Sequence, residues 1–174
     1  MWLNNRYAYT ATMQFAKTSL SSRRQKISPP AVWLLDLWTG QAKRVIGTAA
    51  TANDPGIFRS PSDQLIANGK LYVAEEDTLD GSYADDGFVS IYDLKNPRKP
   101  KFIKRLKPGA GLPSDFAVAH GLTVTPDQQS VYVASYISSY IVKIDTSTDT
   151  VTKVWGASDG LSLPHGGFVA GSNR

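Results

Sequence analysis

The chain contains two histidines, His120 and His165, and each is followed directly by a glycine. Asp63 takes the place of His120 in an upstream segment when residues 71–74 are aligned with residues 131–134. Two imidazoles and a carboxylate form a ligand set that suits a borderline divalent metal. These three side chains are therefore candidate metal ligands. The alternative is that the histidines belong to turns, where the imidazoles bond to the backbone and carry no chemistry.

An acidic stretch over residues 75–86 is a second candidate site. Its carboxylates and backbone carbonyls could surround Ca²⁺, which prefers about six to eight oxygen ligands. The spacing differs from that of an EF-hand loop, so a solvated loop is the alternative to a calcium site. The carboxylates concerned are Asp77, Asp80, Asp85 and Asp86.

Basic residues gather between residues 95 and 107 in a chain whose formal net charge is +4. Such a patch could bind phosphate groups, but lysines on a strand also keep the exposed edge of a sheet from pairing with another chain. We favour the second interpretation, and nucleic acid is not an expected partner. The patch comprises Lys99, Lys101, Lys104 and Arg105.

Other kinds of chemistry find no support in the sequence. Cysteine is absent, which excludes disulfides and thiolate chemistry. The sequence has no P-loop, no dinucleotide-binding glycine motif and no His-Glu-x-x-His zinc motif, so no catalytic residue is assigned. Its apolar runs are far shorter than the roughly 20 residues that cross a bilayer, and no membrane span is predicted.

The elements that must position these residues form a repeat. Residues 120–134 have the pattern of two strands joined by a polar turn, and two further alternating strands follow. The same order recurs upstream, with Asn68-Gly69 as the hairpin turn, and an earlier copy lacks its first strand. Strands are expected at 5–11, 31–37, 42–47, 64–67, 70–75, 88–93, 101–106, 121–125, 130–136, 140–145, 150–155 and 166–170.

Repeats of about 40–50 residues that each form a four-stranded antiparallel meander are typical of β-propeller blades. We therefore predict an all-β fold, a single partial β-propeller over residues 1–174 that forms an incomplete ring. The copies span about 5–47, 62–107 and 118–156, and a further blade starts at 164–174. Propellers close with about 4 to 8 blades, so further blades or a protein partner are expected to complete the ring.

Two long insertions, over residues 12–30 and 75–87, separate the second and third strands of the first two copies. Adjacent strands of a meander run in opposite directions, so these insertions must leave the sheets at the same rim as the starts of the first strands. We expect them to roof a pocket in which Asp63, His120 and His165 converge at the mouth of the central channel.

The third copy resembles one blade of the YVTN-type propellers, named for their Tyr-Val-Thr-Asn repeats. The resemblance lies in residues 120–135 and 141–151. Residues 131–135 depart from the consensus at Ala134 and Ser135, and Gln128 stands where the turn usually has glycine. The resemblance implies a propeller and an extracytoplasmic location, in the periplasm or at the cell surface. It implies no single activity, because members of the family have none in common.

Two classes of function remain open from the sequence. The first is a non-catalytic scaffold that binds a small ligand or a protein and is part of a larger propeller. The alternative is a metal-dependent enzyme, such as a lactonase-like hydrolase or a copper oxidoreductase, with its site at the channel mouth. The lack of a catalytic motif favours the binding module. The enzyme is supported by the three candidate metal ligands, Asp63, His120 and His165.

Overall fold

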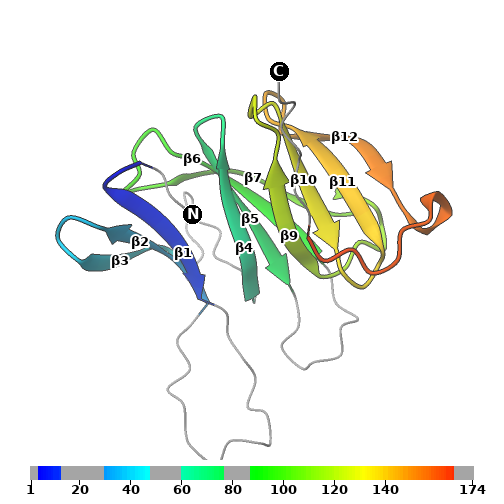
Figure 1. Ribbon diagram of the computed structural model, residues 1–174, viewed down its shortest axis with the longest axis horizontal. Coiled ribbons are helices and arrows are strands. Elements are labelled where there is room, and N and C mark those ends of the chain that lie inside the picture. The colour runs from blue at the N-terminus through cyan, green and yellow to red at the C-terminus, as the bar shows by residue number, and fades with distance from the viewer. Residues whose placement is uncertain (1–3, 13–29, 48–59, 77–86, 167–174) are drawn as a thin grey trace, which may run out of the picture.

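The computed structural model describes residues 4–12, 30–47, 60–76 and 87–166. Within these residues the chain forms three β-sheets that follow one another along the sequence, and one short 3₁₀ turn at Ala157–Asp159 (Figure 1). The first sheet contains β1 (Tyr7–Thr12), β2 (Ala31–Asp36) and β3 (Gln41–Ile46). The second contains β4 (Ser60–Ala67), β5 (Lys70–Glu76), β6 (Gly87–Asp93), β7 (Lys101–Pro108) and the two-residue β8 (Gly111–Leu112). The third contains β9 (Ala119–Val124), β10 (Ser130–Ser135), β11 (Tyr140–Asp145) and β12 (Thr150–Trp155).

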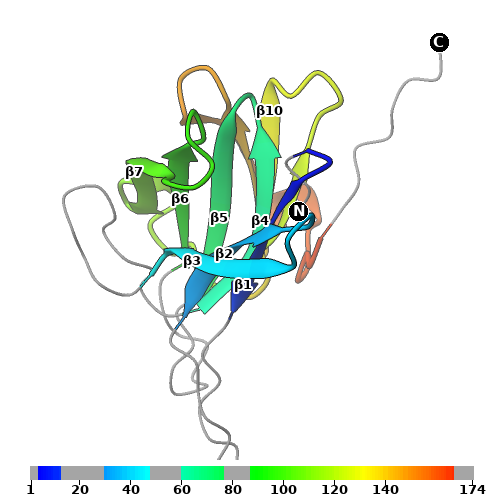
Figure 2. The same ribbon diagram turned by 90° about the vertical axis from the view of Figure 1, so that its left-hand side faces the viewer.

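Each sheet is an antiparallel meander in which sequence neighbours pair, apart from β8, which runs parallel to β7. The first strands of the second and third sheets, β4 and β9, lie side by side, and β1 lies next to β4 (Figures 1 and 2). This is the arrangement of consecutive propeller blades, so the predicted fold class is confirmed. Of the strand expected at 166–170, residues 167–170 lie outside the described residues, as do most of the two insertions.

The core lies between the sheets. Successive side chains of a strand point to opposite faces, so alternate residues of β5 join different parts of this core. Leu71 and Val73 of β5 pack toward the first sheet, against Tyr9 and other apolar residues. Tyr72 and Ala74 point the opposite way, into a cluster shared with β9, β10 and β11. Residues 71–76 are all buried, because the second sheet is covered on both faces. Among the described residues, the second sheet is therefore more deeply buried than the first and the third.

An aspartate ends β2, β6 and β11, one strand in each sheet, and shapes the turn that follows. Asp145 Oδ1 accepts hydrogen bonds from the backbone N–H groups of Ser147 and Thr148, at 2.8 and 3.0 Å. Asp36 and Asp93 accept equivalent bonds in their own turns. The bonds to Asp145, above all that from the Ser147 hydroxyl, lower the pKa of its carboxyl to about 2. The repeated aspartate is thus explained by turn formation.

The strands β3, β7 and β12, one in each sheet, each carry one β-bulge, at Val45, Ile103 and Thr152. A bulge adds one residue to a strand, so every side chain beyond it changes face relative to a simple alternation. In β7 the residues on either side of the bulge pair with Ile91 and Tyr92. The bulge decides which basic side chains of this strand face solvent.

Candidate functional site

One edge of the sheets gathers the side chains that can do chemistry. The ends of β5 and β10 and the starts of β4, β6 and β9 meet there, at the lower edge in Figure 1. Four residues of this edge, which we call the histidine cluster, are Glu76, His120, Tyr136 and His165.

The two imidazoles lie against each other. The ring centres of His120 and His165 are 4.0 Å apart, and the rings are inclined by 59°. The ring of Tyr136 meets His165 edge-on, with centres 5.4 Å apart and an angle of 87°, and lies 6.3 Å from His120. The side chain of His120 is 31% exposed and His165 is exposed, so solvent reaches both rings.

Glu76, the last residue of β5, contacts the Nδ1 side of the His120 ring. Its carboxylate Oε1 contacts Nδ1 of the imidazole, and the carboxylate is almost completely buried. A carboxylate only accepts hydrogen bonds, so Nδ1 carries the proton in this contact. In the neutral ring Nε2 then holds the free lone pair. His120 is thereby prepared to coordinate or to accept a proton at one defined atom.

Residues 115–119 precede His120, and each of their backbone carbonyls accepts a hydrogen bond. Val118, one of these residues, has φ +52°, an unusual conformation for a β-branched residue and one that costs roughly 1–3 kcal/mol. Such strain persists only where the surrounding contacts overdetermine the backbone. The donors to the carbonyls of residues 115–119, in order, are Ser138 Oγ, Gly87 N, Ser135 Oγ, Tyr136 N and Ser62 Oγ, at 2.6, 3.1, 2.6, 3.1 and 2.7 Å.

Gly121 explains why glycine follows the first histidine. A Cβ at this position would lie 2.3 Å from the carbonyl oxygen of His165 and 2.8 Å from Cα of Gly166. No side chain fits there, because real Cβ atoms do not approach backbone this closely. The missing side chain lets residues 165–166 lie directly on β9, and this brings the second imidazole to the first.

Asp63 does not join the histidines, and the alignment that placed it opposite His120 is wrong by one residue. Leu65 pairs with Tyr72 and Thr123 pairs with Tyr132, which puts Ser62 at the position of His120. The turns of the two hairpins, 68–69 and 126–129, differ in length by two residues rather than the three that the alignment assumed.

The carboxylate of Asp63 instead joins two neighbouring strands. Its Oδ2 accepts a hydrogen bond of 2.9 Å from Leu122 N of β9, and its Oδ1 accepts one of 2.8 Å from Gln64 N. In the described part of the chain, no three or more His, Asp or Glu side chains are grouped so as to hold a metal ion. The structure thus brings His120 and His165 together and leaves Asp63 as a structural link.

The basic patch expected at β7 is divided by the bulge. Lys99 and Lys101 are exposed and Lys104 is half-buried, but the side chain of Arg105 is only 4% exposed. Arg105 Nη2 donates to both carboxylate oxygens of Glu75, at 3.0 and 3.2 Å, and its Nε donates to Ser90 Oγ at 2.7 Å. Arg105 is therefore not part of a basic surface, since the bulge turns it to the face opposite Lys101. The calcium candidates Asp77, Asp80, Asp85 and Asp86 lie outside the described residues.

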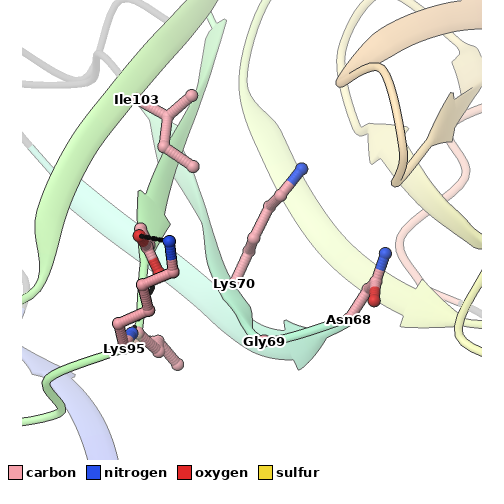
Figure 3. Close-up of a pocket in the computed structure, with 7 residues that line it drawn as sticks. Asn68, Gly69, Lys70, Lys95 and Ile103 are labelled. Atoms are coloured by element: carbon pink, nitrogen blue, oxygen red, sulfur yellow. Dashed lines mark hydrogen bonds and ion pairs between the residues drawn. The ribbon is translucent and has the colours of Figure 1, made fainter.

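A cavity of about 390 Å³ opens at the opposite edge of the second sheet (Figure 3). Its charged groups are already paired. Lys95 lies 3.9 Å from Asp93, and the ammonium of Lys70 donates to Asp149 Oδ2 at 2.6 Å and to the carbonyl of Thr146 at 2.7 Å. The cavity is lined by Asn68, Gly69, Lys70, Asp93, Leu94, Lys95 and Ile103. Its chemistry is less suited to a specific ligand than that of the histidine cluster.

Sequence reasoning missed two members of the histidine cluster, Glu76 and Tyr136. Both hold the same place in their blades, two residues after the matching Ala74 and Ala134. The repeat alignment contained this signal, because both positions fall at the end of a second strand beside the start of a first strand. The shared position was overlooked because glutamate and tyrosine differ in chemistry, and the alignment was searched for residues of similar chemistry.

No family model matches the chain, and no curated protein matches it. Among solved structures, hydrazine synthase of Kuenenia stuttgartiensis is 19% identical over 78% of this chain and 32% of its own, with a TM-score of 0.53. A protein of Lactobacillus plantarum is 14% identical over 87% of this chain and 37% of its own, with a TM-score of 0.51. The chain thus spans about a third of the length of these structures.

These similarities, at such low identity, concern the fold alone. They agree with the three consecutive meanders and place the chain among β-propeller-like proteins. None of the described residues forms a helix long and apolar enough to cross a membrane.

Proposed function

We propose that this chain is the ligand-binding section of a larger β-propeller, that it is non-catalytic, and that the histidine cluster is its binding centre. The observation that carries the proposal is the contact of Glu76 with Nδ1 of His120, which leaves Nε2 free on a solvent-accessible ring 4.0 Å from a second imidazole. A few well-placed polar groups at the end of a rigid scaffold are what a specific binding site needs.

The scaffold is rigid where the ligand would bind. His120 follows a backbone segment whose carbonyls are all held, and that segment includes the strained Val118. A preorganised group loses little conformational entropy when it binds. His165 is exposed and can adjust to what binds. One fixed and one adjustable imidazole suit ligand capture.

The rest of the proposal concerns the context of the chain. Because the chain spans about a third of the length of the structures it resembles, further blades or a protein partner would complete the ring. The YVTN-like third copy supports an extracytoplasmic location for the whole propeller. Both statements extend beyond the histidine cluster and are tested separately from it, by the size of the particle in solution and by fractionation of cells.

A screen by protein-observed NMR, with a library of small fragments as the probe, tests the binding centre. We expect bound fragments to shift the imidazole C–H resonances of both histidines in a 1:1 titration, and His120→Ala to abolish these shifts. Asp63→Asn is the matched control, since Asp63 lies on the same edge and its carboxylate bonds to Leu122 N and Gln64 N and to no member of the cluster. Fragments that bind with no effect on either histidine would contradict the proposal.

A second candidate is the metal-dependent enzyme expected as the alternative from the sequence, a lactonase-like hydrolase or a copper oxidoreductase. The Glu76–His120 contact favours it, because a carboxylate behind an imidazole is a usual setting for a metal-bound or proton-transferring histidine. Turnover of a lactone or of a reducing substrate that is lost in His120→Gln would support the enzyme. Binding without turnover would support the binding module.

A further inference from the structure

We infer that the ligand of the histidine cluster is one divalent transition-metal ion of the copper or nickel type, bound by Nε2 of His120 and the imidazole of His165. The inference rests on the proposed function, because it names the chemical class of the ligand for the same centre. It differs from the set expected from the sequence, because Asp63 is not a ligand and Glu76 acts through His120.

The first step concerns the nitrogen that would bind the metal. Metal-binding histidines almost always donate their second ring N–H to a carboxylate, a carbonyl or water, and this orients the ring and raises the basicity of the ligand nitrogen. Glu76 provides this contact at Nδ1 of His120. Nε2 is left as the coordinating atom of a ring that is still 31% exposed.

The second step concerns distance. An imidazole nitrogen binds a metal at about 2.0–2.1 Å, which places the ion about 3.2 Å from the ring centre. The centres of two rings on one ion can therefore be at most about 6.4 Å apart. The separation of 4.0 Å between His120 and His165 lies within this limit.

The third step concerns the angle at the ion. Ring centres about 4.5 Å apart correspond to neighbouring ligands at a right angle, whereas a tetrahedral ion needs about 5.2 Å. The two ring centres are 4.0 Å apart in the structure, so the exposed His165 ring must move less to reach the right-angled arrangement than to reach the tetrahedral one. Right-angled nitrogen ligands suit Cu²⁺ and Ni²⁺ better than Zn²⁺, and the general order of affinities also favours copper.

The fourth step concerns the remaining ligands. The described residues contain no group of three metal-binding side chains, so in this part of the chain the protein supplies two nitrogens. Water or a further ligand would take the other positions. Two imidazole nitrogens, with no carboxylate oxygen bound to the ion, favour a borderline ion over Ca²⁺ or Mg²⁺, which require oxygen ligands.

Titration of the untagged full chain with Cu²⁺, Ni²⁺, Zn²⁺ and Ca²⁺ tests the inference, since His120 and His165 are its only histidines. Calorimetry should give one Cu²⁺ per chain, tighter than Ni²⁺ and Zn²⁺, with no binding of Ca²⁺ at this centre. The electron paramagnetic resonance spectrum of the copper complex should show hyperfine splitting from two imidazole nitrogens. Zn²⁺ should shift the NMR signals of both histidines in the unmodified protein.

Three variants and one control locate the ion. His120→Gln and His165→Gln should each weaken Cu²⁺ binding by at least about 10-fold, and Glu76→Gln by about 10- to 100-fold while both nitrogens still bind. Asp63→Asn should leave the affinity unchanged. Folding of each variant is checked by circular dichroism, and the spectrum of the unmodified protein tests the inference even if a variant fails to fold.

A different stoichiometry, a copper spectrum without two imidazole nitrogens, or unchanged affinity in folded His120→Gln and His165→Gln would overturn the inference. The fragment screen separates this failure from failure of the proposed function. If fragments bind at the histidines and metals do not, the metal assignment falls and the binding centre remains. If neither binds, both fall.

Discussion

The two edges of the blades join the second and third sheets in opposite ways. At the turn edge, three side chains and one backbone carbonyl form what we call the Asp149 cluster: the side chains of Lys70, Tyr72 and Asp149, and the carbonyl of Thr146. Asp149 accepts hydrogen bonds of 2.6 Å from Lys70 Nζ and 2.7 Å from the Tyr72 hydroxyl. The side chains of Lys70 and Asp149 are only 19% and 7% exposed. Every charge of this cluster serves the contact between blades.

At the histidine edge, two side chains of β4 bond to the backbone of β9, and the two imidazoles stay accessible. Ser62 and Asp63 of β4 bond to backbone groups of β9, through Ala119 O and Leu122 N. The imidazole of His120 has one nitrogen in contact with Glu76 and remains open to solvent. The difference teaches that a closed side-chain network indicates a structural contact, whereas a side chain held from one side indicates a binding site.

The largest expected effect follows from breaking the Asp149 cluster. Asp149→Ala removes the carboxylate that both Lys70 and Tyr72 contact, so we expect the free energy of unfolding to fall by about 3 kcal/mol. Urea unfolding measures it. Asp149→Asn is the control, because asparagine also tolerates the positive φ of 55° and keeps an acceptor for Tyr72. A loss in Asp149→Ala without a loss in Asp149→Asn would show that backbone conformation and the bond to Tyr72, not charge pairing, hold this edge.

The next largest effect concerns the close approach at Gly121. Gly121→Ala places a Cβ against the backbone of His165, so we expect a loss of about 2 kcal/mol in stability and separation of the two imidazoles. Urea unfolding and NMR contacts between the two imidazoles measure these changes. Gly166→Ala is the matched control, since a Cβ there meets nothing within 4 Å. If Gly121→Ala keeps the imidazoles in contact, the histidine edge is not held as described.

Alkaline pH tests the turn edge through the buried phenol of Tyr72. Burial, helped by the hydrogen bond to Asp149, raises the pKa of Tyr72, and burial also raises the pKa of Tyr9. The folded chain then keeps these phenol protons above about pH 10, where the unfolded chain releases them. Their contribution to stability is complete below about pH 10 and falls by about 1.4 kcal/mol per pH unit for each phenol above it. Unfolding of Tyr72→Phe should show a shallower decline, and an identical decline would contradict the assignment.

The smallest effect should come from Trp38 in the turn after β2. Trp38 is 71% exposed and its ring contacts the guanidinium of Arg6, and Lys95 holds the same place in the second sheet. Trp38→Lys should therefore change the free energy of unfolding by less than about 0.5 kcal/mol. Thermal unfolding, compared with Asp149→Ala, measures it. A large loss would mean that the turn edge depends on more than the Asp149 cluster.

Several elements of the fold could be predicted because their causes are local. Alternation of apolar and polar residues marked the strands, and Asn68-Gly69 marked a hairpin. The repeat of these signals predicted blades in sequence order, which the structure confirms.

The site was predictable in part. The proximity of His120 and His165 was expected from the repeat, and the rings do lie together. The position of Asp63 was mistaken because hairpin length was counted from sequence similarity, although strand register is set by backbone pairing. Arg105 was misplaced because a bulge is decided by packing between sheets and leaves no clear trace in composition.

The sequence by itself determined the strands, the turns and the order of the blades, because each depends on a few consecutive residues and on a period of two. Only the tertiary structure decided that Glu76 contacts His120, that Gly121 admits residues 165–166, and that Arg105 is buried against Glu75. These contacts join residues that are distant along the chain. Their geometry follows from register, bulges and the packing of one sheet on another, and these are fixed only when the whole set of strands is in place.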